Sequence, residues 1–165
     1  MPDPPARDVP FTLNGAPFTA RVEAGTSLLE VLREQAGLLS QKNGCAPQGS
    51  CGACTVLVDG RALSSCAVPA VQVAHKHVLT LEGFDPRERH VFAHAFSVAG
   101  AVQCGFCIPG IVVAARRLLD EVPLPTRRQI AESLNNHVCR CTGYVKILDA
   151  IDLAARALQG EPLPP

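Results

Sequence analysis

Residues 44–60 read GCAPQGSCGACTVLVDG and place three cysteines, Cys45, Cys51 and Cys54, in one loop that runs into an apolar, β-branched stretch. A fourth, Cys66, follows in the next short segment. Soft thiolates gathered by a C-x2-C loop are the ligands that a [2Fe–2S] cluster takes. The plant-type pattern has four residues in its first gap, whereas five separate Cys45 from Cys51. These four cysteines form the first predicted ligand set, with zinc as the less favoured metal.

The remaining four cysteines form a second predicted ligand set, split between QCGFC and HVCRCTGY. They are Cys104, Cys107, Cys139 and Cys141. One pair precedes a helix that is expected to begin after Pro109, and the other pair follows the next helix. The positive end of a helix dipole would stabilise a negatively charged cluster there. For this set, spacing alone does not choose between a [2Fe–2S] cluster and a structural zinc site with four cysteine ligands.

Composition excludes several classes of protein. Fifteen Lys and Arg balance fifteen Asp and Glu among 165 residues, so the basic stripe typical of nucleic-acid binding is missing. The longest apolar stretch, 95–115, is interrupted by glycine, proline and glutamine, which argues against membrane insertion. Because residues 1–10 show no apolar signal region, we expect a cytoplasmic protein. In that reducing compartment clustered cysteines bind metals more often than they form disulfides.

The chain is expected to divide near residue 83, and its first unit, 8–83, is predicted to be a mixed α/β domain. Asn14-Gly15 is a hairpin-turn signal, and Ser27 with Glu30 caps a single helix. The strands are expected at 11–13, 18–22, 55–58, 62–66, 71–73 and 78–81. Strands with one crossing helix and a cysteine-rich loop predict a ferredoxin-like β-grasp.

The second unit, 84–160, carries helical signals and short loops. Helices are expected from Pro86, over 111–121, from Thr126 toward Asn136, and over 146–159. Four helices of this length predict a small bundle. The expected fold class is therefore α+β, a ferredoxin-like β-grasp domain followed by an all-α four-helix bundle.

Residues outside the cysteine sets do not form a catalytic constellation. His90 and His94 have metal-ligand spacing on a helix, but a third ligand is missing, so a surface or packing role is expected. His137 is placed either to donate a hydrogen bond to a cluster sulfur or to lie at a helix C-terminus. Tyr144 is expected to anchor the last helix. Two redox centres without catalytic residues indicate an electron relay.

The motifs GCAPQGSCGACTVLVDG, SSC, QCGFCIPG and CRCTGY, in this order, resemble the small iron–sulfur subunit of the molybdenum hydroxylases. That family includes xanthine dehydrogenase, aldehyde oxidoreductase and carbon monoxide dehydrogenase. The resemblance implies one [2Fe–2S] cluster in each predicted domain. The chain departs from the family pattern at Ile108, where Thr is usual, and at residues 136–138, where Gly-Asn-Leu is common and Asn-His-Val stands.

The same resemblance implies partners. A large subunit would hold molybdopterin, a further subunit would hold FAD, and the complex would be a dimer of heterotrimers. Electrons from the molybdopterin centre would pass through both clusters to the flavin or another acceptor. By motif position, Gln103 and Cys141 are implied to lie beside the molybdopterin. The chain would thus be part of an oxidoreductase without being catalytic alone.

Two further interpretations remain open at this point. A cysteine-rich structural zinc module would account for the eight cysteines without redox chemistry. A free-standing ferredoxin would use the same clusters, but its shuttling usually depends on a strongly charged surface, and only 18% of these residues are charged.

Overall fold

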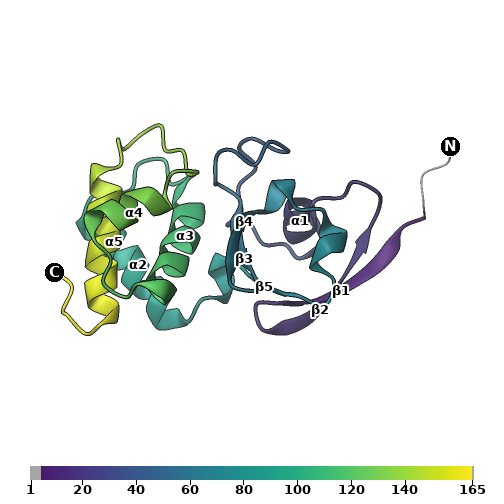
Figure 1. Cartoon of the computed structure of the whole chain (residues 1–165), viewed down its shortest axis with the longest axis horizontal. Helices are drawn as coiled ribbons and strands as arrows, with labels where there is room; N and C mark the ends of the chain where they lie inside the picture. Colours follow the sequence, from purple (N-terminus) through teal and green to yellow (C-terminus); the bar gives the residue numbers. More distant parts are fainter. Residues whose placement is uncertain (1–4, 165) are drawn as a thin grey trace.

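A computed structural model describes residues 5–164 as two packed units, a sheet unit and a helical unit, which lie side by side along the long axis of the molecule (Figure 1). The N-terminal end lies at the far side of the sheet unit and the C-terminal end at the far side of the helical unit. Residues of the cysteine loops from both units line one cavity, so these loops lie where the units meet.

Within residues 5–164, five strands form one mixed sheet in the order β2-β1-β5-β3-β4. They are β1 (Arg7–Leu13), β2 (Ala16–Val22), β3 (Thr55–Val58), β4 (Arg61–Ser64) and β5 (His77–Leu79). β1 and β5 pair in parallel, and the other neighbours pair antiparallel. The turn between β1 and β2 consists of Asn14 and Gly15, both with positive φ, which confirms the predicted hairpin.

One helix covers the sheet unit's core. It begins as α1 (Leu28–Glu30), where the Ser27 hydroxyl caps the Glu30 N–H, and continues as a π-helical turn over Val31–Gln35. Leu28, Val31 and Leu32 are fully buried against the sheet. The long loop that follows this helix carries three of the cysteines back to β3.

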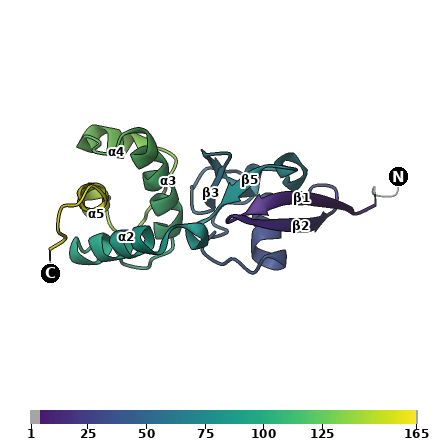
Figure 2. The ribbon, with the colours of Figure 1, turned by 90° about the horizontal axis from the view of Figure 1, so that it is seen from below.

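The helical unit consists of α2 (Pro86–Val98), α3 (Ile108–Glu121), α4 (Arg127–Ser133) and α5 (Val145–Leu158). Seen from below, α2 and α3 reach toward the sheet unit, with α5 and α4 beyond them (Figure 2). Asp85 caps α2, and Thr126 with Gln129 forms the capping box predicted for α4. Their apolar faces share one core with Ile111, Ile130, Ile147 and Ile151 at its centre.

The two units share part of their cores. α3 packs directly against β3, and Leu57 of β3 belongs to the apolar cluster of the helical unit. The side chain of Leu57 points to the opposite face from those of Val56 and Val58, which pack into the sheet unit's own core, because side chains alternate along a strand. One face of β3 is therefore buried in the core of the sheet unit and the other against the helical unit. This packing holds the loop before β3 at the junction of the units.

Two predicted strand segments are corrected by the structure. Residues 71–73 form part of a 3₁₀ turn, Ala70–Val73, and Cys66 lies in another, Ser65–Ala67, after β4 has ended at Ser64. Apolar alternation suggested strands at both places. Both segments instead form short 3₁₀ turns, and the first of them buries Ala70 and Val73 in the core of the sheet unit.

A polar network joins the first hairpin, the segment after β5 and the loop that leads to Cys45. Glu82 accepts hydrogen bonds from the Ser40 N–H at 3.0 Å, the Ser40 hydroxyl at 2.7 Å and the Thr80 hydroxyl at 2.7 Å. Asn14 in turn bonds Thr80. Burial raises the pKa of Glu82, but hydrogen bonds from Thr80 and Ser40 outweigh burial and bring it below the usual 4.5.

This network predicts an acid-sensitive part of the stability. A carboxyl group with a lowered pKa in the folded chain stabilises the fold above its unfolded pKa, and that contribution is lost as pH falls through the folded value. We expect the free energy of unfolding to drop below pH 4.5. Glu82→Gln should cost about 1 kcal/mol near neutral pH and remove this acid-dependent component. Denaturant unfolding of wild type and Glu82→Gln at a series of pH values measures both effects. Glu23→Gln, at an exposed glutamate, is the control. An unchanged acid dependence in Glu82→Gln would contradict this assignment.

No helix in residues 5–164 combines the length and apolar character that a bilayer crossing requires.

Candidate functional site

All eight cysteines lie in the described part of the chain, and none of them forms a disulfide there. They gather in loops at the junction of the two units. Cys45, Cys51 and Cys54 lie in the loop before β3, and Cys66 lies in the turn after β4. The second set lies in the loop before α3 and in the loop between α4 and α5. The structure thus brings each predicted set of four together.

Within each set, the thiols lie two by two. In the first set Cys45 contacts Cys51, and Cys54 contacts Cys66. In the second set Cys104 and Cys141 have their Sγ atoms 3.6 Å apart, and Cys107 contacts Cys139. Two thiolates about 2.3 Å from one tetrahedral metal lie at about this separation.

The pairing bears on which metal group these residues fit. A structural zinc site draws all four cysteine sulfurs around one point, whereas a [2Fe–2S] cluster takes two ligands on each iron. The two-by-two arrangement of the thiols fits the binuclear group in both sets.

Backbone N–H groups are aimed at the sulfurs of the first set. The Ser50 N–H donates to Cys45 Sγ at 3.3 Å, and the Cys66 N–H donates to Cys54 Sγ at 3.5 Å. In the second set the Thr142 hydroxyl lies 3.1 Å from Cys139 Sγ. Such donors stabilise negative charge on sulfur and tune the potential of a cluster. Cys107 also sits at the N-terminus of α3, where the helix dipole favours an anion.

In two of the pairs, the pKa of one thiol is lowered and the pKa of its neighbour is raised. Burial raises the pKa of Cys45, but the hydrogen bonds from Cys51 and Ser50 together outweigh it and lower that pKa to about 7, while burial raises the pKa of Cys51. In the second set, burial and the hydrogen bond to Cys139 raise the pKa of Cys107 to about 12. At Cys139 burial acts in the same direction, but hydrogen bonds outweigh it and the pKa is lowered. Metal binding would therefore displace the retained proton.

The two cysteine sets are linked through the backbone. The Val138 N–H, next to Cys139, donates a 3.0 Å hydrogen bond to the Cys51 carbonyl. A cavity of about 390 Å³ is lined by Cys51 of the first set and by all four thiols of the second. Phe106 also lines it and approaches Gly44 of the first loop. The connection from Cys51 of the first set to Cys139 of the second thus consists of one hydrogen bond and one residue, Val138.

Two glycines permit this close approach of the units. Gly52 has φ +69°, and a side chain there would meet the Asn136 carbonyl and the His137 ring, each at 2.5 Å. Gly110, in the first turn of α3, faces Gly52 so closely that a Cβ would overlap the Gly52 carbonyl oxygen. Neither contact is visible in local sequence, because it joins residues from different units.

Gln103 and Cys141, the residues implied to approach molybdopterin, lie together at the outer edge of the second set. The Gln103 amide donates to the Cys141 carbonyl at 3.2 Å, and both residues are exposed. Exposed apolar side chains lie near this edge in sequence. We call them the apolar rim: Val102, Phe106, Val138 and Val145.

His137 and Tyr144 both support the second set. Tyr144 accepts the Cys139 N–H at 2.8 Å, donates to the His137 carbonyl at 3.0 Å, and directly precedes α5, as its predicted anchoring role requires. Of the two predictions for His137, the placement at a helix C-terminus is wrong, because α4 ends at Ser133 and the buried side chain lies beyond it. Its Nε2 lies 3.0 Å from the Thr55 hydroxyl, and a hydrogen bond from the ring to a cluster sulfur stays a prediction. Burial lowers the pKa of His137 to about 4.

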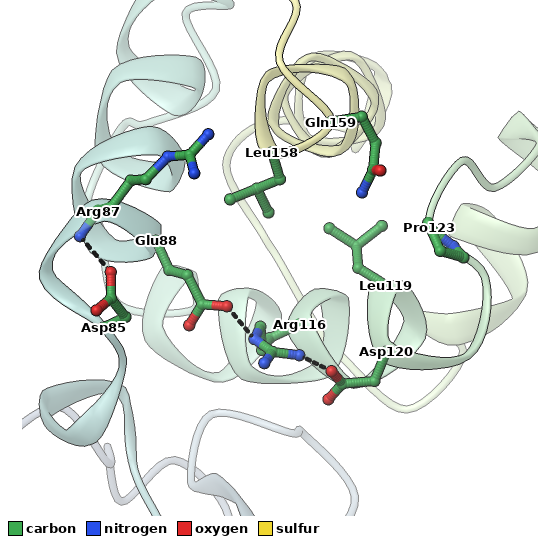
Figure 3. Close-up of a pocket in the computed structure, with 9 residues that line it drawn as sticks. All are labelled: Asp85, Arg87, Glu88, Arg116, Leu119, Asp120, Pro123, Leu158 and Gln159. Atoms are coloured by element: carbon green, nitrogen blue, oxygen red, sulfur yellow. Dashed lines mark hydrogen bonds and ion pairs between the residues drawn. The ribbon is translucent and has the colours of Figure 1, made fainter.

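A second, charged cavity of about 370 Å³ lies between α2, α3 and the end of α5, and none of its lining residues is a cysteine (Figure 3). Arg116 pairs there with Glu88 at 2.7 Å and with Asp120. The first of these ion pairs joins α2 to α3, so this cavity is a feature of helix packing, separate from the cysteine site.

Two protein families match this chain. The family described as "[2Fe-2S] binding domain" matches residues 80–152, and the family described as "2Fe-2S iron-sulfur cluster binding domain" matches residues 11–80. Each match contains one of the two cysteine sets.

Among curated proteins, the nicotinate dehydrogenase small FeS subunit of Eubacterium barkeri is 41% identical over 87% of this chain and 92% of its own length. The xanthine dehydrogenase iron-sulfur-binding subunit of Escherichia coli O157:H7 is 47% identical over 85% of this chain and 89% of its own.

Among solved structures, aldehyde oxidoreductase from Desulfovibrio desulfuricans superimposes with a TM-score of 0.88 and 40% identity, over 94% of this chain and 17% of that longer one. A chain of quinoline 2-oxidoreductase from Pseudomonas putida superimposes with a TM-score of 0.86 and 38% identity, over 96% of this chain and 100% of that one. With its motifs, its α+β fold and its relatives in agreement, the chain belongs to the family of small iron–sulfur subunits of the molybdenum hydroxylases, which are components of oxidoreductases.

Proposed function

We propose that this chain is the electron-transfer subunit of a heteromeric molybdenum hydroxylase and holds two [2Fe–2S] clusters. Cys45, Cys51, Cys54 and Cys66 would hold the first, within a domain of residues 8–83. Cys104, Cys107, Cys139 and Cys141 would hold the second, within a four-helix bundle of residues 84–160. When bound, each cluster supplies a site that accepts and releases one electron. The observation that carries this proposal is the two-by-two arrangement of the thiols in both sets.

The direction of transfer is proposed from exposure and contacts. Cys104 and Cys141 are exposed, and they lie beside Gln103 at the edge where a molybdopterin-binding subunit would dock. The apolar rim supports such a contact, since exposed apolar side chains favour a protein interface. Transfer to the first set would follow the hydrogen bond from the Val138 N–H to the Cys51 carbonyl.

The acceptor side is proposed to be the loop around Cys45. Residues 46–48 of that loop are exposed, so a flavin-binding subunit or another acceptor could approach the first set there. A dimer of heterotrimers, each with a molybdopterin subunit, an FAD subunit and this chain, would complete the enzyme. Cytoplasmic assembly is part of the same proposal.

Metal and acid-labile sulfide analysis of the anaerobically purified chain tests this function. We expect about four iron and four sulfide per chain, two of each per [2Fe–2S] cluster, and two distinct EPR signals after reduction. Co-purification with a molybdopterin-containing subunit is the second expected result. Zinc without sulfide, and no signal on reduction, would instead establish the structural zinc module.

A further inference from the structure

His137 occupies the space between the two cysteine loops. The residue is 8% exposed, and its ring lies against Gly52. Gly52 and Ala53 are the two residues between Cys51 and Cys54. Its Nε2 bonds the Thr55 hydroxyl, which lies 82 positions earlier in the chain. His137 thus belongs to the loop of the second set but makes its side-chain hydrogen bond to the unit that carries the first.

The hydrogen-bond directions follow from the Thr55 hydroxyl, which has a single hydrogen. That hydrogen is donated to the Gly52 carbonyl at 2.7 Å. Thr55 must therefore accept from His137, so Nε2 of the ring carries a hydrogen and donates it. The chain of bonds runs from His137 to Thr55 to Gly52 and ends on the backbone of the first cysteine loop.

The peptide group that follows His137 continues this link. The adjacent Val138 N–H donates to the Cys51 carbonyl at 3.0 Å, and the His137 carbonyl accepts from Tyr144. Two consecutive carbonyl groups of the first loop are therefore held from the second loop. The Val138 N–H binds the Cys51 carbonyl, and the His137 side chain reaches the Gly52 carbonyl through Thr55. Because the ring fills the space over Gly52, a shift of the second loop along the first would have to displace a packed side chain and break its hydrogen bond to Thr55.

We propose that His137 is a positioning residue that fixes the separation of the two cysteine sets, by donating to Thr55 while its backbone neighbour holds Cys51. The electronic coupling of the two sets then depends on a side chain that is not itself a ligand. This inference rests on the proposed relay function for its consequence, whereas the positioning itself is a property of the polypeptide and can be tested separately.

The first test measures hydrogen exchange of the Val138 amide in the purified full chain. His137→Phe keeps a ring of similar size but removes the donor, and His137→Gln restores an N–H the same number of bonds from the Cα. We expect exchange at Val138 to become about tenfold faster in the Phe variant and to return toward wild type in the Gln variant. Thr55→Val should accelerate exchange at Val138 as His137→Phe does. Thr55→Ser keeps the hydroxyl and should leave the exchange rate near that of wild type.

Combining His137→Phe with Thr55→Val tests whether the two residues act through one bond. The Val138 amide of the double variant should exchange no faster than in either single variant. Either substitution alone already breaks the hydrogen bond between His137 and Thr55, so the second has no further bond to break. His90→Phe, the same change at an exposed histidine, is the control and should leave Val138 unchanged. Additive effects, or unchanged exchange in His137→Phe, would overturn the proposal.

The second test reads the magnetic interaction between the two reduced sites by EPR in cluster-loaded chains of matched iron content. We expect the interaction to be lost or reduced in His137→Phe and restored in His137→Gln. An interaction that persists in His137→Phe, or that fails to return in His137→Gln, would refute positioning by this hydrogen bond. If wild type shows no signal, the relay function fails, and the exchange of Val138 still decides the role of His137.

Discussion

Cys139→Ser is expected to remove the second cluster and to stop electron flow from the molybdopterin subunit. Cys139 is paired with Cys107 and lies one hydrogen-bonded step from Cys51, so its loss would remove a ligand and disturb the link between the sets. Iron and sulfide should fall by about half, because each [2Fe–2S] cluster depends on four ligands. One of the two EPR signals should disappear, and turnover of the assembled complex should be abolished. Cys104→Ser, which breaks the other pair of the same set, should behave alike.

Cys54→Ser provides the reciprocal control. Cys54 contacts Cys66 in the first set, so this variant should lose the other EPR signal and keep the one that Cys139→Ser removes. Both variants should retain the same fold by circular dichroism. Turnover that survives in Cys139→Ser would show that the second set is not on the electron route, and loss of both signals in each variant would argue against two separate centres.

Gly110→Ala is the second large effect that we expect. At an ordinary position in a helix this change stabilises a protein by about 0.5–1 kcal/mol, because alanine loses less conformational freedom than glycine. At Gly110 the new methyl group would overlap the Gly52 carbonyl oxygen across the junction of the units. We expect a loss of about 1–3 kcal/mol in the free energy of unfolding, since overpacking forces backbone shifts in a packed interface.

Two further glycine variants separate this clash from backbone strain. Gly52 and Gly105 both have positive φ, but only Gly52 has neighbours that a Cβ would strike. Gly105→Ala should cost only the left-handed strain of about 1–2 kcal/mol, whereas Gly52→Ala should cost more. Denaturant unfolding of the three variants and wild type measures this order. If Gly110→Ala stabilises the chain, α3 does not approach the first cysteine loop as closely as described.

Local patterns predicted most of the elements, because their causes are local. The Asn14-Gly15 hairpin, the Asp85 and Thr126 caps and the prolines that open α2 and α3 act within a few residues of sequence. The failures came where packing overrides pattern. Residues 71–73 alternate like a strand but belong to a 3₁₀ turn, Ala70–Val73, which buries Ala70 and Val73 in the core of the sheet unit.

The amino-acid sequence by itself determined which residues can hold metal and in which two sets. Ligand chemistry resides in residue type and in short spacings such as those of Cys51 with Cys54 and Cys104 with Cys107. Only the tertiary structure decided how the thiols pair, that Val138 bonds Cys51, and that His137 bonds Thr55 across the junction. Those contacts join residues far apart in the chain and exist because α3 packs against β3, a long-range arrangement that no local propensity encodes.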